Sequence, residues 1–277
     1  MNVDVARGTS PEQAARRFES DPTLSGLSFL GTLRSEFAKL LALRTTFWLS
    51  LISVGLCLLI AVAVAATTQD GDEEVWVAQG AVVGLWFAMM LLGALSVISM
   101  TTEFTSGAVR SSLTAVPRRS MLYLAKSLAT ATFIGLVTVV IVVLNHLTVV
   151  LFTDAVSLGA PFSNSDVLHM YLTNWSAVVV TALLGLGLGA LLRSSAGGIV
   201  VLTVFLFVLQ TVLFIAWGIM QADWLETLLD YEYASLIETY TNPEATDPGP
   251  LFGGIGMLIW AAVPFGLGWL AFARRDV

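Results

Sequence analysis

Few side chains in this chain have the type and spacing needed for chemistry on a bound substrate. No Gly in the sequence is followed by Lys, so the nucleotide-binding loop GxxxxGK[ST] is absent. There is no HExxH zinc pair and no GxSxG nucleophile motif, and two histidines and one cysteine are too few for a metal cluster of these ligands. We therefore expect a protein that is not an enzyme, with no catalytic residue, no bound metal and no cofactor of its own.

Three polar side chains lie inside otherwise apolar runs, where such groups are costly and are kept for hydrogen bonds or for function. Asn145 and His146 lie toward the outer half of one run, and Gln210 lies near the middle of another. Each could bond a neighbouring helix or face a substrate pathway, and both interpretations stay open. No Asp, Glu, Lys or Arg lies near the middle of such a run, which favours an apolar or amphiphilic cargo and an external energy source.

The polar stretch after residue 100 is the most informative segment. Its length and Pro117 predict a short cytoplasmic helix of about three turns that begins near Glu103 and ends before the proline. Glu103 would then lie in the first turn, where the helix dipole favours an anion. The alternative is a plain basic loop that contacts anionic lipid headgroups.

Membrane-spanning helices must position these residues, because the composition is that of a polytopic membrane protein. Of the 277 residues, 56% are hydrophobic and only 12% are charged, against roughly 25% charged in soluble domains. The fold class that we expect is all-α, with an external segment at 221–250 and six transmembrane helices. The apolar windows place these helices at 46–66, 76–100, 127–152, 171–192, 196–220 and 251–273.

The charges alternate between the connecting segments. All 13 Lys and Arg residues fall on one side of the expected spans, which the positive-inside rule identifies as the cytoplasm. Both termini are then cytoplasmic, and with no secretory signal peptide in the first 45 residues the first span acts as the insertion signal. The net charge of −7 is thus the sum of a basic inner face and an acidic outer face. Nucleic acid is not an expected partner. The acidic outer segment is expected either to attract cationic cargo or to stay solvated.

The N-terminal region divides into two parts. Residues 1–25 are polar and are predicted to form a flexible cytoplasmic tail. In residues 26–45, leucines recur at steps of three and four with Arg34, Glu36 and Lys39 between them, which predicts an amphipathic helix along the membrane interface with its basic groups toward lipid phosphates. The alternative is a continuation of the first span as one bent helix.

Small residues recur at helical spacing in several spans. Gly80 and Gly84 form one such pair, and Gly185 and Gly189 form another. Because small residues let helix backbones approach closely in lipid, these pairs predict tight helix crossings.

The polar stretch resembles the first cytoplasmic loop of the type-2 ABC transporter permease family. The residues at the corresponding places are Glu103, Phe104, Gly107, Arg110, Leu113, Pro117, Arg118 and Lys126. Two further stretches agree with the family, the approach Arg34–Leu40 with Arg44 and the turn Leu191–Gly197, so the resemblance extends from about Ser25 to the end. The external segment 221–250 is long for that family, and its acidity is not a family feature.

The resemblance implies the membrane subunit of an ABC exporter. Two six-span copies, expected to be a homodimer, would pair in the plasma membrane, and each would bind a separate ATPase subunit that carries ATP and magnesium. The helix at 26–45 and the short helix after Glu103 would form the docking surface. The expected ATPase-coupling residues are Arg34, Glu36, Lys39, Glu103, Phe104, Gly107, Arg110, Leu113, Pro117, Arg118 and Arg119.

The resemblance also assigns the second and fifth spans, with Gln210, to the dimer contact and the pathway walls, and His146 and Asn145 are further pathway candidates. The expected function is ATP-driven export of a hydrophobic or amphiphilic substrate, such as a drug, a lipid or a peptide-like molecule. The alternatives are an ion-coupled secondary transporter and a non-transporting membrane sensor or anchor.

Overall fold

The computed structural model describes residues 28–69, 71–105 and 119–274, and every regular element in these ranges is a helix. Six helical segments are long and apolar enough to cross a membrane, which confirms the all-α, multi-pass class predicted from the sequence. The predicted tail, residues 1–25, lies outside the described residues. The six segments are Arg44–Thr67, Glu74–Phe104, Arg119–Phe152, Ser165–Leu192, Ser195–Met220 and Pro250–Arg274.

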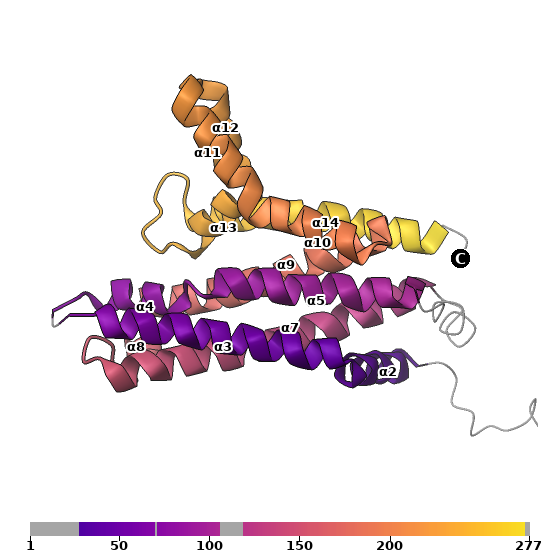
Figure 1. Cartoon of the computed structure of the whole chain (residues 1–277), viewed down its shortest axis with the longest axis horizontal. Helices are drawn as coiled ribbons and strands as arrows, with labels where there is room; N and C mark the ends of the chain where they lie inside the picture. Colours follow the sequence, from indigo (N-terminus) through magenta and orange to yellow (C-terminus); the bar gives the residue numbers. More distant parts are fainter. Residues whose placement is uncertain (1–27, 70, 106–118, 275–277) are drawn as a thin grey trace, which may run out of the picture.

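Four long helices run side by side and form the bundle to which the other elements attach (Figure 1). They are α3 (Arg44–Thr67), α5 (Leu85–Thr105), α7 (Arg119–Phe152) and α9 (Ser165–Leu192), the last preceded by the short α8 (Ala160–Ser163). In the most apolar window of α9, 61% of the residues are buried inside the protein, against 22% in α3. The corresponding window of the second span, Glu74–Phe104, is 67% buried, so α5 and α9 together form the centre of the bundle, whereas α3 leaves most of its apolar surface to the surroundings.

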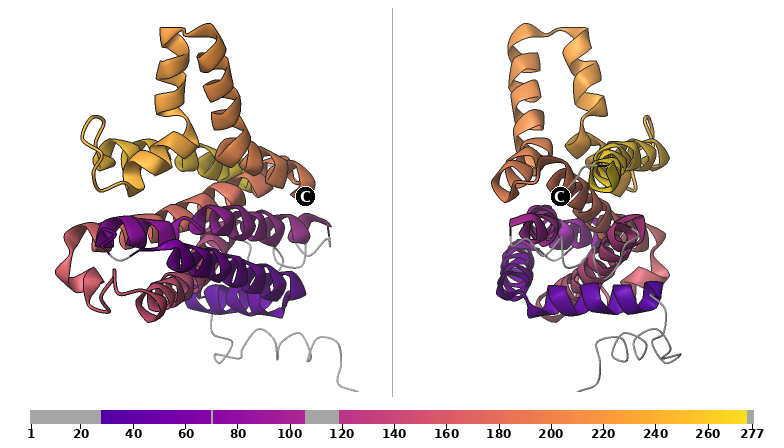
Figure 2. Two further views of the ribbon diagram at one scale, coloured as in Figure 1. Left: turned by 60° about the vertical axis from the view of Figure 1, so that its left-hand side comes forward. Right: turned by 90° about the vertical axis from the view of Figure 1, so that its right-hand side faces the viewer.

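The segment predicted to be amphipathic is a separate helix, α2 (Phe29–Ala42). Ser28 caps it, because its hydroxyl oxygen accepts a hydrogen bond from the Gly31 N–H at 3.0 Å. Leu43 is extended, with φ −77° and ψ 121°, so α2 ends there and α3 starts in a new direction. Figures 1 and 2 show α2 lying across the bundle, so it does not continue α3 as one bent helix.

Two of the six spans are interrupted. The second consists of α4 (Glu74–Val82) and α5, separated by Val83 and Gly84. A Cβ on Gly84 would lie 3.1 Å from the Cα of Cys57, so the glycine lets this break approach α3 closely. The fifth consists of α10 (Ser195–Thr203), a π-helical turn η1 (Val204–Val208) and α11 (Leu209–Met220). Such π-helical turns occur frequently at functional sites.

Beyond η1 the chain leaves the bundle. In Figures 1 and 2, α11 and α12 (Asp223–Tyr231) form an antiparallel hairpin that projects from the bundle. No residue of α11 is buried. The next helix, α13 (Tyr233–Thr241), returns to pack on α14 (Pro250–Arg274). The predicted external segment 221–250 therefore contains two helices, α12 and α13.

Glycines in α9 set two close helix crossings. A Cβ on Gly185 would lie 2.7 Å from the carbonyl oxygen of Gly93 in α5, as the predicted glycine pair requires. On the other face, a Cβ on Gly187 would lie 2.5 Å from the backbone nitrogen of Phe265 in α14. Both obstacles are backbone atoms, so a larger residue at either position has to move a whole helix.

This crossing gives a stability prediction. Gly187→Ala should destabilise the protein by roughly 1–3 kcal/mol, because the added methyl group overpacks the contact between α9 and α14. The measurement is the melting temperature of the purified protein in a mild detergent. Gly266→Ala is the matched control, since a Cβ on Gly266 meets no atom within 4 Å. Equal melting temperatures for the two variants would show that the close crossing is not required.

Candidate functional site

Four charged side chains from three helices meet at one end of the bundle. The Lys126 ammonium of α7 lies 2.6 Å from Glu36 Oε2 of α2 and 2.9 Å from Glu103 Oε1 of α5. The Lys39 ammonium of α2 lies 2.5 Å from Glu36 Oε1 and 3.2 Å from Glu103 Oε1. The side chains of Glu36, Glu103 and Lys126 are only 1%, 7% and 6% exposed, whereas that of Lys39 is 44% exposed. We call these four residues the ion cluster.

The helix ends that carry the cluster make pairing necessary. Glu103 lies near the C-terminus of α5, where the helix dipole disfavours a negative charge, and Lys126 is buried in the second turn of α7. The prediction that Glu103 lies in the first turn of a short helix is therefore wrong, because the helix that begins at Leu85 continues through Glu103 to Thr105. Ion pairing between α5 and α7 offsets the unfavourable position of Glu103 and the burial of the Lys126 charge.

Lys39 turns toward protein carboxylates and not toward lipid phosphates. Partial burial lowers its pKa, but the hydrogen bond to Glu36 and the charge of Glu103 outweigh this effect, so its pKa is raised above the usual value. The group stays fully protonated at neutral pH. The prediction that α2 directs its basic groups to lipid phosphates is thus wrong for Lys39, while Arg34 is exposed on the outer side of α2.

A cavity of about 330 Å³ adjoins the ion cluster between α2, α5 and α7. Lys39, Glu103 and Lys126 reach it, and Leu40, Leu43 and Ser99 form part of its wall. Oε2 of Glu103 is buried and has no hydrogen-bond donor among the described residues. The cluster thus has both an open acceptor atom and free space beside it.

Aromatic contacts connect the end of α5 to two other elements. The guanidinium of Arg193, in the turn after α9, lies 5.0 Å from the centre of the Phe104 ring, a cation–π contact. Arg193 adopts a left-handed conformation with φ 50°, and Ser194 caps the next helix through a hydrogen bond from the Gly197 N–H. Phe104 also contacts Phe272 of α14, with ring centroids 6.2 Å apart.

The structure brings together only part of the predicted coupling set. Glu36, Lys39 and Glu103 meet in the ion cluster, with Phe104 beside Glu103 in sequence, and Arg119 is the first residue of α7. Arg34 is exposed on α2 and is not a member of the ion cluster. The remaining predicted members lie outside the described residues, namely Gly107, Arg110, Leu113, Pro117 and Arg118.

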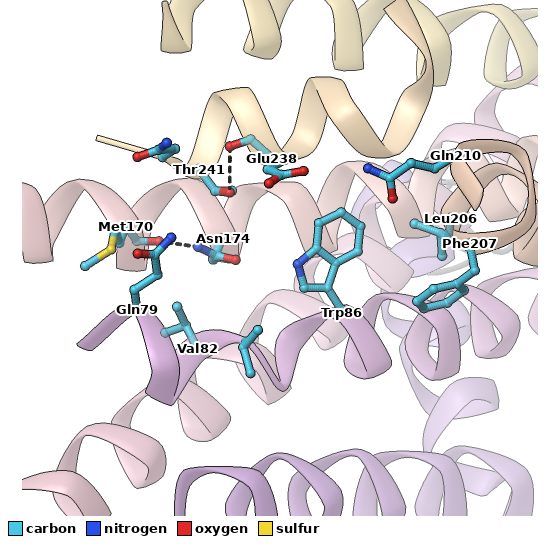
Figure 3. Close-up of a pocket in the computed structure, with 12 residues that line it drawn as sticks. Gln79, Val82, Trp86, Met170, Asn174, Leu206, Phe207, Gln210, Glu238 and Thr241 are labelled. Atoms are coloured by element: carbon cyan, nitrogen blue, oxygen red, sulfur yellow. Dashed lines mark hydrogen bonds between the residues drawn. The ribbon is translucent and has the colours of Figure 1, made fainter. Parts of the chain in front are cut away.

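A second cavity, of about 350 Å³ and with several polar residues in its lining, lies at the opposite end of α5 (Figure 3). We call it the outer cavity. Trp86 lines it from α5, Asn174 from α9, Gln210 from α11 and Glu238 from α13. The remaining lining residues are Gln79, Val82, Val83, Met170, Leu206, Phe207, Thr241 and Asn242.

The other two polar candidates bond neighbouring elements. The Asn145 amide donates to the Ala81 carbonyl oxygen of α4 at 2.9 Å. The ring nitrogens of His146 lie 3.0 Å from the Tyr171 hydroxyl and 3.3 Å from the Leu158 carbonyl oxygen. Neither residue lines the outer cavity with Gln210, so the geometry favours a helix-bonding role for both.

The sequence patterns did not indicate that Lys126 joins the ion cluster or that Glu238 lines the outer cavity. Two features of the sequence could have indicated the place of Lys126. Lys126 stands at the start of an apolar run, and Glu36 lies on the same helical face as Leu33 and Leu40. An acid on an apolar face requires a basic partner. Glu238 had no local signal, because its neighbours in the outer cavity come from distant parts of the chain.

The chain was also compared with known proteins. No protein-family model matches it, and no curated protein matches it either.

The ion cluster predicts unequal effects of removing its two lysines. Lys126→Ala leaves Glu36 and Glu103 buried with one partly exposed cation, so it should destabilise the protein by about 3–5 kcal/mol. Lys39→Ala removes the more exposed cation and should destabilise the protein clearly less. Detergent melting temperatures and membrane abundance of the two variants provide the measurement. A Lys126→Ala variant as stable as Lys39→Ala would mean that the cluster does not hold α2 to the bundle.

Proposed function

We propose that this chain is the membrane-spanning permease subunit of an ATP-driven ABC transporter in the plasma membrane. Its substrate is a hydrophobic or amphiphilic molecule, such as a drug, a lipid or a peptide-like compound, and the direction is export. A separate ATPase subunit binds and hydrolyses ATP with magnesium, since the sequence carries no nucleotide-binding loop. Both termini lie in the cytoplasm, where the basic residues gather.

The ion cluster is the observation that carries this proposal. It attaches α2, which lies outside the six spans, to the ends of two spans through buried charges. A force applied to α2 from the cytoplasm then reaches α5 and α7 directly, because separating the helices would leave buried charges without partners. Such an attached surface helix suits a subunit that is driven from outside the membrane.

The exposed side of α2 suits the docking of a partner. Arg34 is exposed, and Leu30 and Leu41 are 65% and 64% exposed, although the facing positions Glu36 and Leu40 are buried. In this proposal α2 lies at the membrane interface, and its outward residues contact lipid and the ATPase subunit. The stretch after α5, with Arg110, completes the docking surface.

A second copy of the chain forms the other half of the transporter. The projecting helix α11 has no buried residue, and Phe214, Ile215 and Ile219 are among its exposed apolar side chains. A helix that is apolar and unburied within one copy suits an isologous contact with its twin in the membrane. The outer cavity, which α11 helps to form, then lies close to the contact between copies.

Transport requires at least two global states whose balance the ATPase shifts. In the proposed cycle, ATP-driven closure of the two ATPase subunits presses on α2 and on the segment after α5. The ion cluster passes this displacement to α5 and α7, and α5 carries it to the outer cavity. The cavity beside the cluster provides space for such a displacement.

The test uses the full-length chain co-purified with its ATPase subunit and reconstituted in lipid nanodiscs. Glu103→Gln keeps the shape of the side chain and removes its charge, so it should reduce permease-dependent stimulation of ATP hydrolysis about tenfold, as expected for a lost coupling of about 1.4 kcal/mol. Arg110→Ala should act in the same direction. The amount of each variant in the membrane is measured in parallel.

Asp154→Asn is the control, because it removes one exposed carboxylate beyond the opposite end of α7. It should leave the stimulation unchanged. Normal stimulation in Glu103→Gln at normal abundance would contradict the coupling role. A chain that purifies without any ATPase and supports ion-driven uptake would overturn the proposed function in favour of a secondary transporter.

A further inference from the structure

The outer cavity carries one negative charge without a basic partner. Glu238 is its only Asp or Glu, and no Lys or Arg lines it. The carboxylate forms no hydrogen bond or ion pair with another described residue. The described Lys and Arg residues belong to α2, the first turn of α3, the first two turns of α7, the turn after α9 and the end of α14, all of which lie at the other end of the bundle.

The cavity places an aromatic face near this charge. In Figure 3 the Glu238 carboxylate and the Gln210 amide point toward each other, and the Trp86 ring lies on the other side of the space between them. The electron-rich face of an indole attracts a cation within about 6 Å of its centre. Phe207 adds a second ring to the wall. A positive group in this space would therefore meet a carboxylate and a π face together.

Amide oxygens provide further acceptors. Asn174 donates its amide hydrogen to the Met170 carbonyl oxygen at 2.9 Å, which leaves its own carbonyl oxygen for a ligand. The Gln210 amide forms no hydrogen bond with another described residue. The rest of the wall is apolar, with Val82 and Leu206 among its members. A ligand that fits this lining has one charged, hydrogen-bonding end and an apolar body.

Other ligand classes fit the lining less well. A divalent metal needs several carboxylate, histidine or thiolate ligands, and the described residues contain no group of three that could hold one. An anion would be repelled by Glu238. A neutral apolar molecule would take water from the carboxylate without replacing its hydrogen bonds. The volume of about 350 Å³ is in the range of small-molecule sites.

We propose that the outer cavity binds an amphiphilic organic cation whose positive group lies between the Glu238 carboxylate and the Trp86 ring, with its apolar part against Val82, Leu206 and Phe207. Quaternary and protonated amines have this chemistry. That the cation is also the exported substrate rests on the proposed function, but binding at the cavity does not. A binding assay without ATP and without the ATPase therefore tests the site alone.

The experiment uses the full-length chain in dodecyl maltoside, a detergent without an ammonium group. The probe is benzyltrimethylammonium, and binding is measured by isothermal titration calorimetry against detergent blanks. Its neutral isostere, neopentylbenzene, has carbon in place of nitrogen and reports the apolar contribution. The cation should bind at least about tenfold more tightly than the isostere.

Two variants test whether Glu238 and Trp86 hold the positive group of the probe. Glu238→Gln should weaken binding of the cation about tenfold and leave binding of the isostere unchanged. Trp86→Leu should weaken cation binding about fivefold, as expected for a lost cation–π contact of about 1 kcal/mol. Glu226→Gln is the matched control, since Glu226 is an exposed acid of α12 outside the cavity lining, and it should bind like the unchanged protein.

The outcomes separate this proposal from the transport proposal. Equal affinity for the cation and its isostere would overturn the cation site, whatever the protein transports. So would an equal loss of affinity for the cation in Glu238→Gln and Glu226→Gln. Confirmed binding without ATP-driven export would leave the site standing and reject the proposed function. Competition by dihexanoylphosphatidylcholine would assign the cation to a lipid headgroup, and its absence would assign it to a soluble amine, with the site confirmed in both cases.

Discussion

Two carboxylates and two ammonium groups meet where α2, α5 and α7 converge, three of them almost completely shielded from water. Charges in such surroundings stay ionised only when each has an opposite charge close by. Glu36 therefore cannot leave Lys126 without a large cost in free energy, and α2 cannot leave the bundle without separating them. Helix-helix packing alone would allow α2 to slide, whereas paired charges fix its position.

The same constraint gives the two ends of the bundle different characters. At the end that carries the basic residues, the buried charges are paired with each other. At the other end, Glu238 lines a cavity whose lining contains no Lys or Arg. Helix α5 joins the two, because Trp86 lies in its first turn and Glu103 near its last residue, about 26 Å apart along the axis at 1.5 Å per residue. A rigid helix of this length is a direct mechanical connection between the proposed docking surface and the proposed ligand site.

The sequence predicted the six spans well because a bilayer demands about 20 apolar residues in each, and that requirement is visible in composition. It predicted the span ends less well, because backbone hydrogen bonding continues past the last apolar residue. The second span was expected to end at Met100, yet α5 continues to Thr105, and the third was expected to begin at Ser127, yet α7 begins at Arg119. Glu103 was therefore expected in the first turn of a separate short helix and Lys126 at the entry to the third span, although Glu103 lies in α5 and Lys126 lies in the second turn of α7.

The candidate sites depended on contacts that no short stretch of sequence contains. Glu36 and Lys126 are 90 positions apart, and Trp86 is still farther from Glu238. Gln210 was a pathway candidate from the sequence, since an amide in an apolar run is conspicuous on its own, and it lines the outer cavity. Its partners in the outer cavity depend on the turn at η1 and on the return of α13, which apolar windows cannot reveal.

The most direct test of the central claim is site-specific photo-crosslinking in intact cells. Benzoylphenylalanine at Arg34, on the exposed side of α2, should crosslink to an ATPase subunit, and the yield should change when ATP is depleted. The same group at Trp76, which is 56% exposed near the start of α4, should give no such product. If Arg34 yields no ATPase crosslink, or if Trp76 yields an equal one, then α2 is not the surface through which an ATPase drives this protein.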